Sequence, residues 1–191
     1  MLDPATGKQQ LLLGQWSAIL TTRTGLELFV RPAAPDDKAL VDAFLSGLAH
    51  DDLRFRFLTP IARAGRALLD MLVEVDHVRT EDFLAFADQD GEKVLVASAM
   101  LAAEPGMTRA EVAIAISPDF QRRGVGWTLL DFVAHDAAAR GIRSLESVEC
   151  RDNRAAIALE REMGFTASAF PGDATLTLLR KELVAPADAR P

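Results

Sequence analysis

The segment that most constrains the fold runs from residue 110 to residue 141, where an apolar strand leads through a glycine-containing turn into a long helix. Residues 112–116 read Val-Ala-Ile-Ala-Ile, Ser117-Pro118 ends the strand, and residues 121–126 read Gln-Arg-Arg-Gly-Val-Gly. Apolar residues at helical spacing then predict a helix over roughly 124–140 that ends at Gly141. Such a turn presents backbone N–H groups and two arginines at the positive end of a helix, where a phosphate can bind. An ordinary strand-to-helix turn is the alternative.

Two common nucleotide-binding motifs do not fit this turn. The third glycine position of a dinucleotide fingerprint holds Leu129, and no Gly-Lys-Ser or Gly-Lys-Thr sequence of a P-loop is present. The turn therefore predicts a phosphate site of another kind.

The rest of the chain alternates between strand and helix patterns. We expect a hairpin of residues 17–22 and 26–31, a helix capped by Asp36 or Asp37, and a second helix over 63–75. Residues 83–88, 93–103 and 110–116 predict an antiparallel meander. A strand over 142–150, a helix capped by Asp152 or Asn153 that ends at Gly164, and a hairpin of residues 165–170 and 174–183 complete the chain. One domain accommodates 191 residues without a linker.

Composition narrows the classes of function. A net charge of −7, with 21 basic against 28 acidic residues, disfavours a nucleic-acid or anionic-membrane surface. The longest nearly apolar run, residues 94–103, is far shorter than the roughly 20 residues of a membrane span. The single cysteine, Cys150, favours a reducing cytoplasm and is interpreted as a buried structural thiol. The three histidines lie far apart, so we expect no metal site.

Two motifs together resemble the GNAT superfamily of N-acetyltransferases. Residues 121–126 match its Q/R-x-x-G-x-G/A pyrophosphate signature, and residues 153–165, an Asn followed by a helix ending in Gly-Phe, resemble its second signature. The resemblance covers about residues 24–183. It implies an α/β (α+β) fold with a mixed, mostly antiparallel central sheet flanked by helices and opened near the end of the 110–116 strand.

A narrower resemblance points to one branch of that superfamily. Residues 28–60, with Val30-Arg31-Pro32 and the Arg/Phe alternation of residues 52–57, look like the catalytic domain of bacterial protein-lysine acetyltransferases that modify acyl-CoA synthetases. The resemblance implies a 24–185 acetyltransferase domain after an extension, residues 1–23, that holds the first hairpin strand; residues 186–191 form a frayed tail. Arg54 and Arg56 are interpreted as solvated or ion-paired, with the lining of a substrate cleft as the alternative, and Phe44, Phe55 and Phe57 are interpreted as core.

The acetyl-transfer interpretation gives roles to individual residues. A lysine amine, with a solution pKa near 10.4, must lose a proton before it attacks, and the resemblance places the glutamate general base at Glu111. Glu149, where the family usually has an aliphatic residue, is the second candidate, and a solvated strand residue is the alternative for Glu111. The family's proton-donating tyrosine position is Glu160, and the chain contains no tyrosine. The resemblance implies that the following residues bind the cofactor: Ile114, Ile116 (through its backbone N–H), Gln121, Arg122, Arg123, Gly124, Val125, Gly126, Trp127 and Asn153.

The sequence thus predicts transfer of an acetyl group from acetyl-CoA to a primary amine. The acceptor is expected to be a protein lysine, for example of an acyl-CoA synthetase. A small-molecule amine N-acetyltransferase and a non-catalytic acyl-CoA-binding module are the alternatives. The expected chain is cytoplasmic, a monomer or homodimer, with no metal, nucleic acid or membrane partner.

Overall fold

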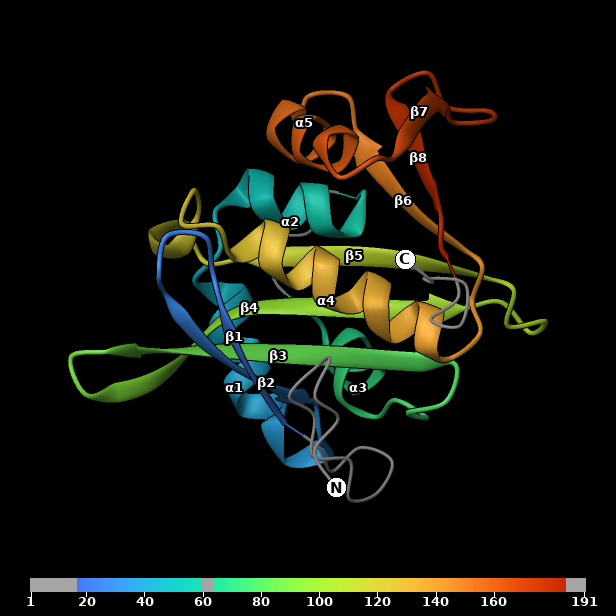
Figure 1. The fold of residues 1–191 in the computed structure, drawn as a ribbon. Coiled ribbons are helices and arrows are strands. Elements are labelled where there is room, and N and C mark those ends of the chain that lie inside the picture. Colours follow the sequence, from blue (N-terminus) through green and yellow to red (C-terminus); the bar gives the residue numbers. More distant parts are fainter. Residues whose placement is uncertain (1–16, 60–63, 185–191) are drawn as a thin grey trace.

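The structure, a computed structural model, describes residues 17–59 and 64–184. Within these residues eight strands form one sheet in the order β1-β2-β3-β4-β5-β6-β8-β7 (Figure 1). All neighbouring strands are antiparallel except β5 and β6, which are parallel. The strands are β1 (Ala18–Thr21), β2 (Glu27–Pro32), β3 (Thr80–Gln89), β4 (Glu92–Ala103), β5 (Arg109–Ile116), β6 (Ser144–Cys150), β7 (Thr166–Ala169) and β8 (Leu176–Glu182).

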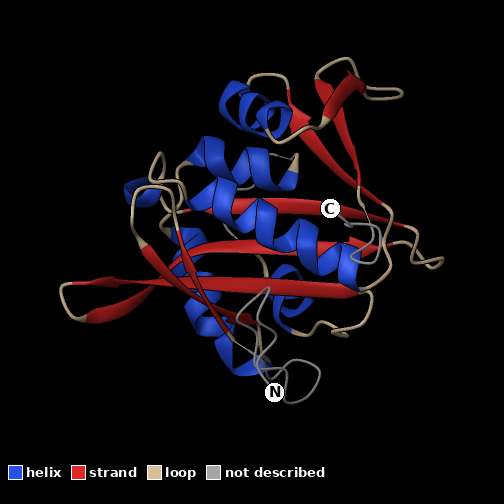
Figure 2. Cartoon of the chain, viewed as in Figure 1, coloured by secondary structure: helices blue, strands red, loops and turns tan. Residues whose placement is uncertain are grey.

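Helices cover both faces of the sheet (Figure 2). On one face α1 (Lys38–Ser46), α2 (His50–Phe57) and α3 (Arg66–Val73) enclose one apolar cluster with side chains of β3, β4 and β5. On the other face α4 (Val125–Ala139) buries its apolar side against a second cluster, and α5 (Arg154–Glu162) packs at its edge. The mixed, mostly antiparallel sheet flanked by helices is therefore confirmed.

Local turn chemistry explains why the meander forms where the sequence predicts it. Asp90 and Gly91 both have positive φ, 56° and 88°, which suits the two-residue turn between β3 and β4. The hairpin of β1 and β2 and that of β7 and β8 are also as predicted, but β8 lies between β6 and β7 in the sheet. β1 pairs with β2, whereas residues 1–16 and the tail 186–191 lie outside the described residues.

Asp37 occupies the predicted N-cap position of α1, but its carboxylate does not make the expected capping hydrogen bond. It accepts hydrogen bonds at 2.6 Å from Arg31 Nη1 and Nη2 and one at 2.8 Å from the Ala34 N–H. The bond from the Arg31 guanidinium lowers the pKa of Asp37 below its usual range. The carboxylate thus joins β2 to the start of α1 through a two-pronged ion pair.

The sheet opens between β5 and β6. These strands pair over Arg109–Glu111 and Ser144–Glu146, and β6 then continues against β8 (Figure 1). Side chains alternate between the two faces of a strand, so Ala110, Val112 and Ile114 of β5 face α4, and Glu111, Ala113 and Ala115 face the α2 side. Among the described residues no helix is long and apolar enough to cross a membrane.

Candidate active site

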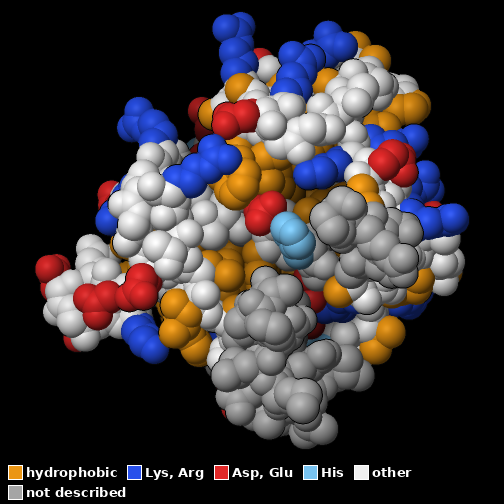
Figure 3. All heavy atoms as spheres, in the orientation of Figure 1, with side chains coloured by type: hydrophobic (Ala, Val, Ile, Leu, Met, Phe, Trp, Pro, Cys, Tyr) orange, Lys and Arg blue, Asp and Glu red, His pale blue; other side chains and the backbone are white. Residues whose placement is uncertain are grey.

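A cavity of about 540 Å³ lies where β5 and β6 separate. One wall is the C-terminal end of β5, and the opposite wall is the C-terminal end of β6 together with α5. The start of α4 closes one end, and α2 packs against β5 on the face of the sheet opposite α4. The space-filling view in Figure 3 looks onto the α4 side of the sheet and shows Lys and Arg side chains around its upper part, with apolar surface between them.

The end of the cavity beside α4 can bind an anion. The first N–H groups of an α-helix have no acceptor within the helix, and at α4 they lie in the segment Gly124–Trp127. Gly124 has a φ of +82°, a left-handed conformation that places it as the N-cap of α4. The Thr24 hydroxyl donates to the Arg123 carbonyl at 2.7 Å, which fixes this turn to the β1–β2 hairpin.

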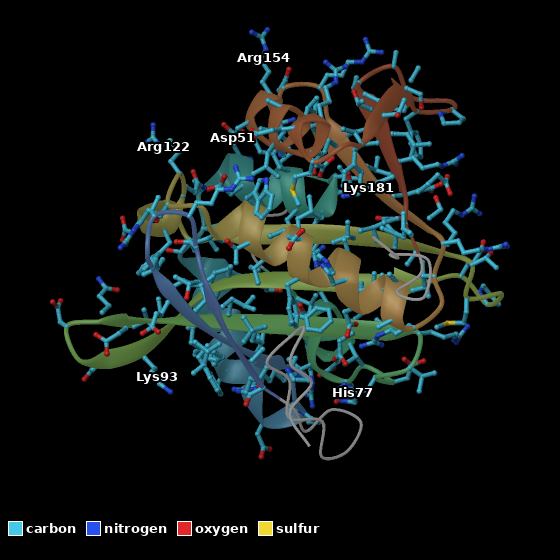
Figure 4. All side chains as sticks on the ribbon, viewed as in Figure 1. Asp51, His77, Lys93, Arg122, Arg154 and Lys181 are labelled. Carbon is cyan, nitrogen blue, oxygen red and sulfur yellow. The ribbon has the colours of Figure 1, made fainter. Side chains whose placement is uncertain are left out.

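Gly126 keeps the cavity open at the same end. A Cβ atom at this position would lie 3.1 Å from Ile116 Cδ1 and 3.5 Å from Leu159 Cδ1. Arg122 and Arg154 come from the segments on either side of the cavity and extend outward in Figure 4. Gln121 Nε2 donates to Asp52 Oδ2 at 3.1 Å and so connects the turn to α2. Backbone donors, a guanidinium and free space together fit the diphosphate of a CoA thioester.

Most of the predicted site residues line this cavity, and three do not. Arg123 and Val125 are outside its lining, and Val125 is buried in the α4 core with 1% of its surface exposed. Glu111 is solvent-exposed and also outside the lining. The predicted residues that line the cavity are Ile114, Ile116, Gln121, Arg122, Gly124, Gly126, Trp127, Glu149 and Asn153.

Two carboxyl groups meet on the α4 side of the opened strands. Asn153 caps α5 by accepting a hydrogen bond from the Ala156 N–H, and its Nδ2 donates to Glu149 Oε2 at 2.7 Å. Ser147 Oγ donates to Glu160 Oε2 at 2.6 Å. Burial raises the pKa of Glu149 to about 8, with the neighbouring Glu160 adding to the effect and Asn153 opposing it. Burial also raises the pKa of Glu160 to about 7, opposed by Ser147.

A second polar cluster lies on the α2 side of the sheet. Arg56 lines the cavity, and its buried Nη2 has no hydrogen-bond partner among the described residues. Burial lowers the pKa of Arg56, while the charges of Asp82 and Glu111 oppose this. Asp82 is fully buried and accepts a hydrogen bond from Ser98 Oγ at 2.8 Å; its burial raises the pKa to about 6, against Arg56 and Ser98. Desolvation also raises the pKa of Glu111, opposed by Arg56.

The interpretation of the Arg/Phe segment therefore needs correction. Arg56 lines the cavity, as the alternative of a cleft-lining residue has it, and Phe55 also lines the cavity rather than lying in the core. Arg54 does pair with charges, with Asp51 at 3.5 Å and Asp152 at 3.6 Å. The spacing of residues 54–57 was visible in the sequence, but its meaning depends on α2 lying across β5. The other polar cavity residues to which sequence reasoning gave no role in the site are Asp52, Asp152, Arg154 and Glu160.

Cys150 is buried, as expected of a structural thiol, with 7% of its surface exposed. Burial raises the pKa of this thiol above its usual range, so that its reactive thiolate form is disfavoured. Within residues 17–59 and 64–184, no group of three or more His, Cys, Asp or Glu side chains could hold a metal ion.

Comparison with known proteins agrees with this geometry. The sequence pattern of the Acetyltransferase (GNAT) family matches residues 50–165. Acetyltransferase PA5475 of Pseudomonas aeruginosa is 31% identical over 159 residues, which cover 83% of this chain and 86% of that protein. Acetyltransferase Pat of Mycolicibacterium smegmatis is 29% identical over 136 residues, or 70% of this chain and 39% of Pat. The fold is similar to that of the GNAT domain of S. lividans PAT, with a TM-score of 0.79 at 23% identity, covering 87% of this chain and 97% of that domain.

Proposed function

The chain belongs to the GNAT family of acetyltransferases, and we propose that it acetylates the side-chain amine of a lysine in a protein. The family uses acetyl-CoA, which supplies the acetyl group as a thioester. The observation that carries the proposal is the cavity at the opened strands, which has anion-binding backbone at one end and the carboxyl groups of Glu149 and Glu160 in its wall.

A protein acceptor is supported by two resemblances. Residues 28–60 look like the catalytic domain of bacterial protein-lysine acetyltransferases, and Pat of M. smegmatis is among the relatives of this chain. An acyl-CoA synthetase is the acceptor that this branch suggests. We place the reaction in the cytoplasm, the compartment that the single cysteine favours.

In this mechanism the turn before α4 binds the diphosphate of acetyl-CoA. The first-turn N–H groups of α4, together with Gln121 and Arg122, hold the diphosphate, and Arg123 adds positive charge beside them. Ile114, Ile116 and Trp127 line the path of the pantetheine arm, and Asn153 lies across from them. Val125 contributes its backbone, since its side chain is in the core. The backbone N–H of Ile116 would stabilise the oxyanion of the thioester carbonyl.

Glu111 is the general base of this proposal. Glu111 lies on the face of β5 that α2 covers. In this proposal a cationic amine binds beside the Glu111 carboxylate, whose ionised form is favoured by the positive charge of Arg56. Partial desolvation raises its pKa above its usual range and toward that of the amine, which favours proton removal at neutral pH. The carboxylate accepts the amine proton directly or through one water.

The Glu111→Gln variant tests this role because it keeps the size of the side chain and removes its basicity. We expect the acetylation rate to fall by on the order of 10² to 10⁴. Acetyl-CoA affinity, measured by calorimetry, should stay unchanged because the diphosphate site is separate. The matched control is Glu146→Gln, since Glu146 is the register partner of Glu111 on β6 and pairs with Arg180 outside the cavity. A Glu111→Gln rate equal to that of wild type would contradict the assignment.

The acceptor class is tested by mass spectrometry of acetylated products. The chain is incubated with acetyl-CoA and either an acyl-CoA synthetase, lysine peptides or a polyamine. We expect acetyl-lysine on the protein and little product from the polyamine. Acetylation confined to the polyamine would make the chain a small-molecule N-acetyltransferase, and binding without transfer would make it an acyl-CoA-binding module.

A further inference from the structure

The proposed function, on which this inference rests, leaves two carboxyl groups of the cavity without a role. Glu149 on β6 and Glu160 on α5 both line it, and Glu160 is 6% exposed. Their hydrogen bonds from Asn153 and Ser147 hold both groups against one wall. Glu160 is buried and Glu149 is half-buried, and neither forms a salt bridge within the described residues. Carboxyl groups in such surroundings are costly to ionise, so their presence in a cavity wall calls for an explanation.

Glu149 and Glu111 lie on opposite faces of the opened sheet. Ala110 and Leu145 are register partners that both pack in the α4 cluster, and alternation along β6 puts Ser147 and Glu149 on the same face as Leu145. Glu111 and Glu146 are the next register pair, on the α2 side. Glu149 also lies beyond Glu146, where β6 is no longer paired with β5. Glu111 therefore lies on one face of the separating strands, and Glu149 lies on the other.

The two carboxyl groups together retain a proton at neutral pH. Burial and the charge of Glu160 both disfavour an ionised Glu149, whose pKa is raised to about 8. Glu160 has a pKa of about 7 and accepts a hydrogen bond from the Ser147 hydroxyl. This bond favours the ionised form of Glu160, so the shared proton stays on Glu149. The other charged side chains that line the cavity are Asp52 and Arg56 from α2, Arg122 from the turn before α4, and Asp152 and Arg154 at the start of α5.

We propose that Glu149 is a catalytic acid that protonates the departing CoA sulfur, and that Glu160 is a positioning residue that keeps the proton on Glu149. As the bond between the amine nitrogen and the acetyl carbon forms, the carbon–sulfur bond breaks and its electron pair goes to sulfur. The Glu149 proton moves to that sulfur, which gives the CoA thiol and a Glu149 carboxylate. The cationic amine loses two protons on becoming the amide: one goes to Glu111 and the other to solvent. A proton then returns from Glu111 to Glu149 through solvent before the next turnover, so one proton is released overall.

The pH profile of kcat tests the proposal, with acetyl-CoA and amine both saturating. Wild type should lose activity above about pH 8, as Glu149 loses its proton. Glu149→Gln should be slower at neutral pH by on the order of 10²-fold and should lack that alkaline fall, with its acetyl-CoA affinity retained. Glu160→Gln should keep the fall but move it to lower pH, because removing the Glu160 charge lowers the pKa of Glu149. Glu146→Gln is the control and should keep the alkaline fall, because the charge of Glu146 raises the pKa of Glu111 and is not among the causes of the shift at Glu149.

Each other result overturns the proposal. A wild-type profile without an alkaline fall would do so with no variant needed, and so would a Glu149→Gln profile that retains the fall. A rate loss matched by an equal loss of acetyl-CoA affinity would make Glu149 a binding residue. An alkaline fall that disappears in Glu160→Gln rather than in Glu149→Gln would make Glu160 the donor. Failure of wild type to acetylate any amine would instead refute the proposed function, so the two failures are distinguishable.

Discussion

Replacing Gly124 by alanine should destabilise the protein for two separable reasons. The φ of +82° at this position is left-handed, which costs an L-residue with a side chain roughly 1–2 kcal/mol. The new Cβ would also lie 3.1 Å from Thr22 Cβ, and Thr22 is 4% exposed and cannot turn away freely. Crowding of a packed side chain adds roughly 1 kcal/mol or more. We therefore expect a total loss of about 2–3 kcal/mol in the free energy of unfolding.

Gly141 at the other end of α4 provides the matched control. Its φ of +86° is almost the same, but a Cβ there would meet no atom within 4 Å. Urea unfolding of Gly141→Ala thus measures the backbone cost alone, and the difference between the two variants measures the contact with Thr22. Equal losses in the two variants, at equal m-values, would refute the claim that Thr22 packs too closely against Gly124 to accept a Cβ atom there.

Three further predictions concern the site. Gly126→Asp should greatly reduce acetyl-CoA affinity in calorimetry, because its Cβ crowds Ile116 and its charge opposes the phosphates; unchanged affinity would place the cofactor elsewhere. Cys150→Ala should keep amine acetylation with a modest loss of stability, and an inactive variant with an acetyl group trapped on the wild-type thiol would instead indicate covalent catalysis. The free energy of unfolding should fall between about pH 5 and pH 8, by about 1.4 kcal/mol per pH unit for each extra proton that the native state holds on Glu149 and Glu160. The double variant Glu149→Gln/Glu160→Gln should flatten this slope in a pH series of urea titrations, and an unchanged slope would contradict the raised pKa values.

The parts of the fold that the sequence predicts are those set by neighbouring residues. Asp90-Gly91 determines a turn between two strands, and the turn before α4 carries its glycines within a few residues of the helix that it starts. The insertion of β8 between β6 and β7 has no such local signal. The same limit explains Asp37, whose carboxylate finds Arg31 on β2 rather than the helix that follows it.

The candidate site divides in the same way. Gly124 and Gly126 belong to one short motif, so their place in the cavity follows from the sequence alone. The contact of Glu160 with Ser147 depends on how α5 lies on β6, and the place of Arg56 depends on α2 crossing β5. Side chains that meet only through tertiary packing are not a fixed number of residues apart in the sequence, so no sequence pattern predicts their contact.

Helix α2 buries little of its surface, and this affects how fast its amide hydrogens exchange with solvent. This helix buries one side chain, Leu53, whereas α4 buries eight. Side-chain links from α2 to the cavity walls include the Gln121–Asp52 hydrogen bond at 3.1 Å and the partly exposed Arg54–Asp152 pair at 3.6 Å, both of which contribute little free energy. Amide hydrogens of α2 should therefore exchange by local opening, orders of magnitude faster than those of α4. We therefore expect α2, which carries Arg56, to open locally while the sheet beneath it stays folded.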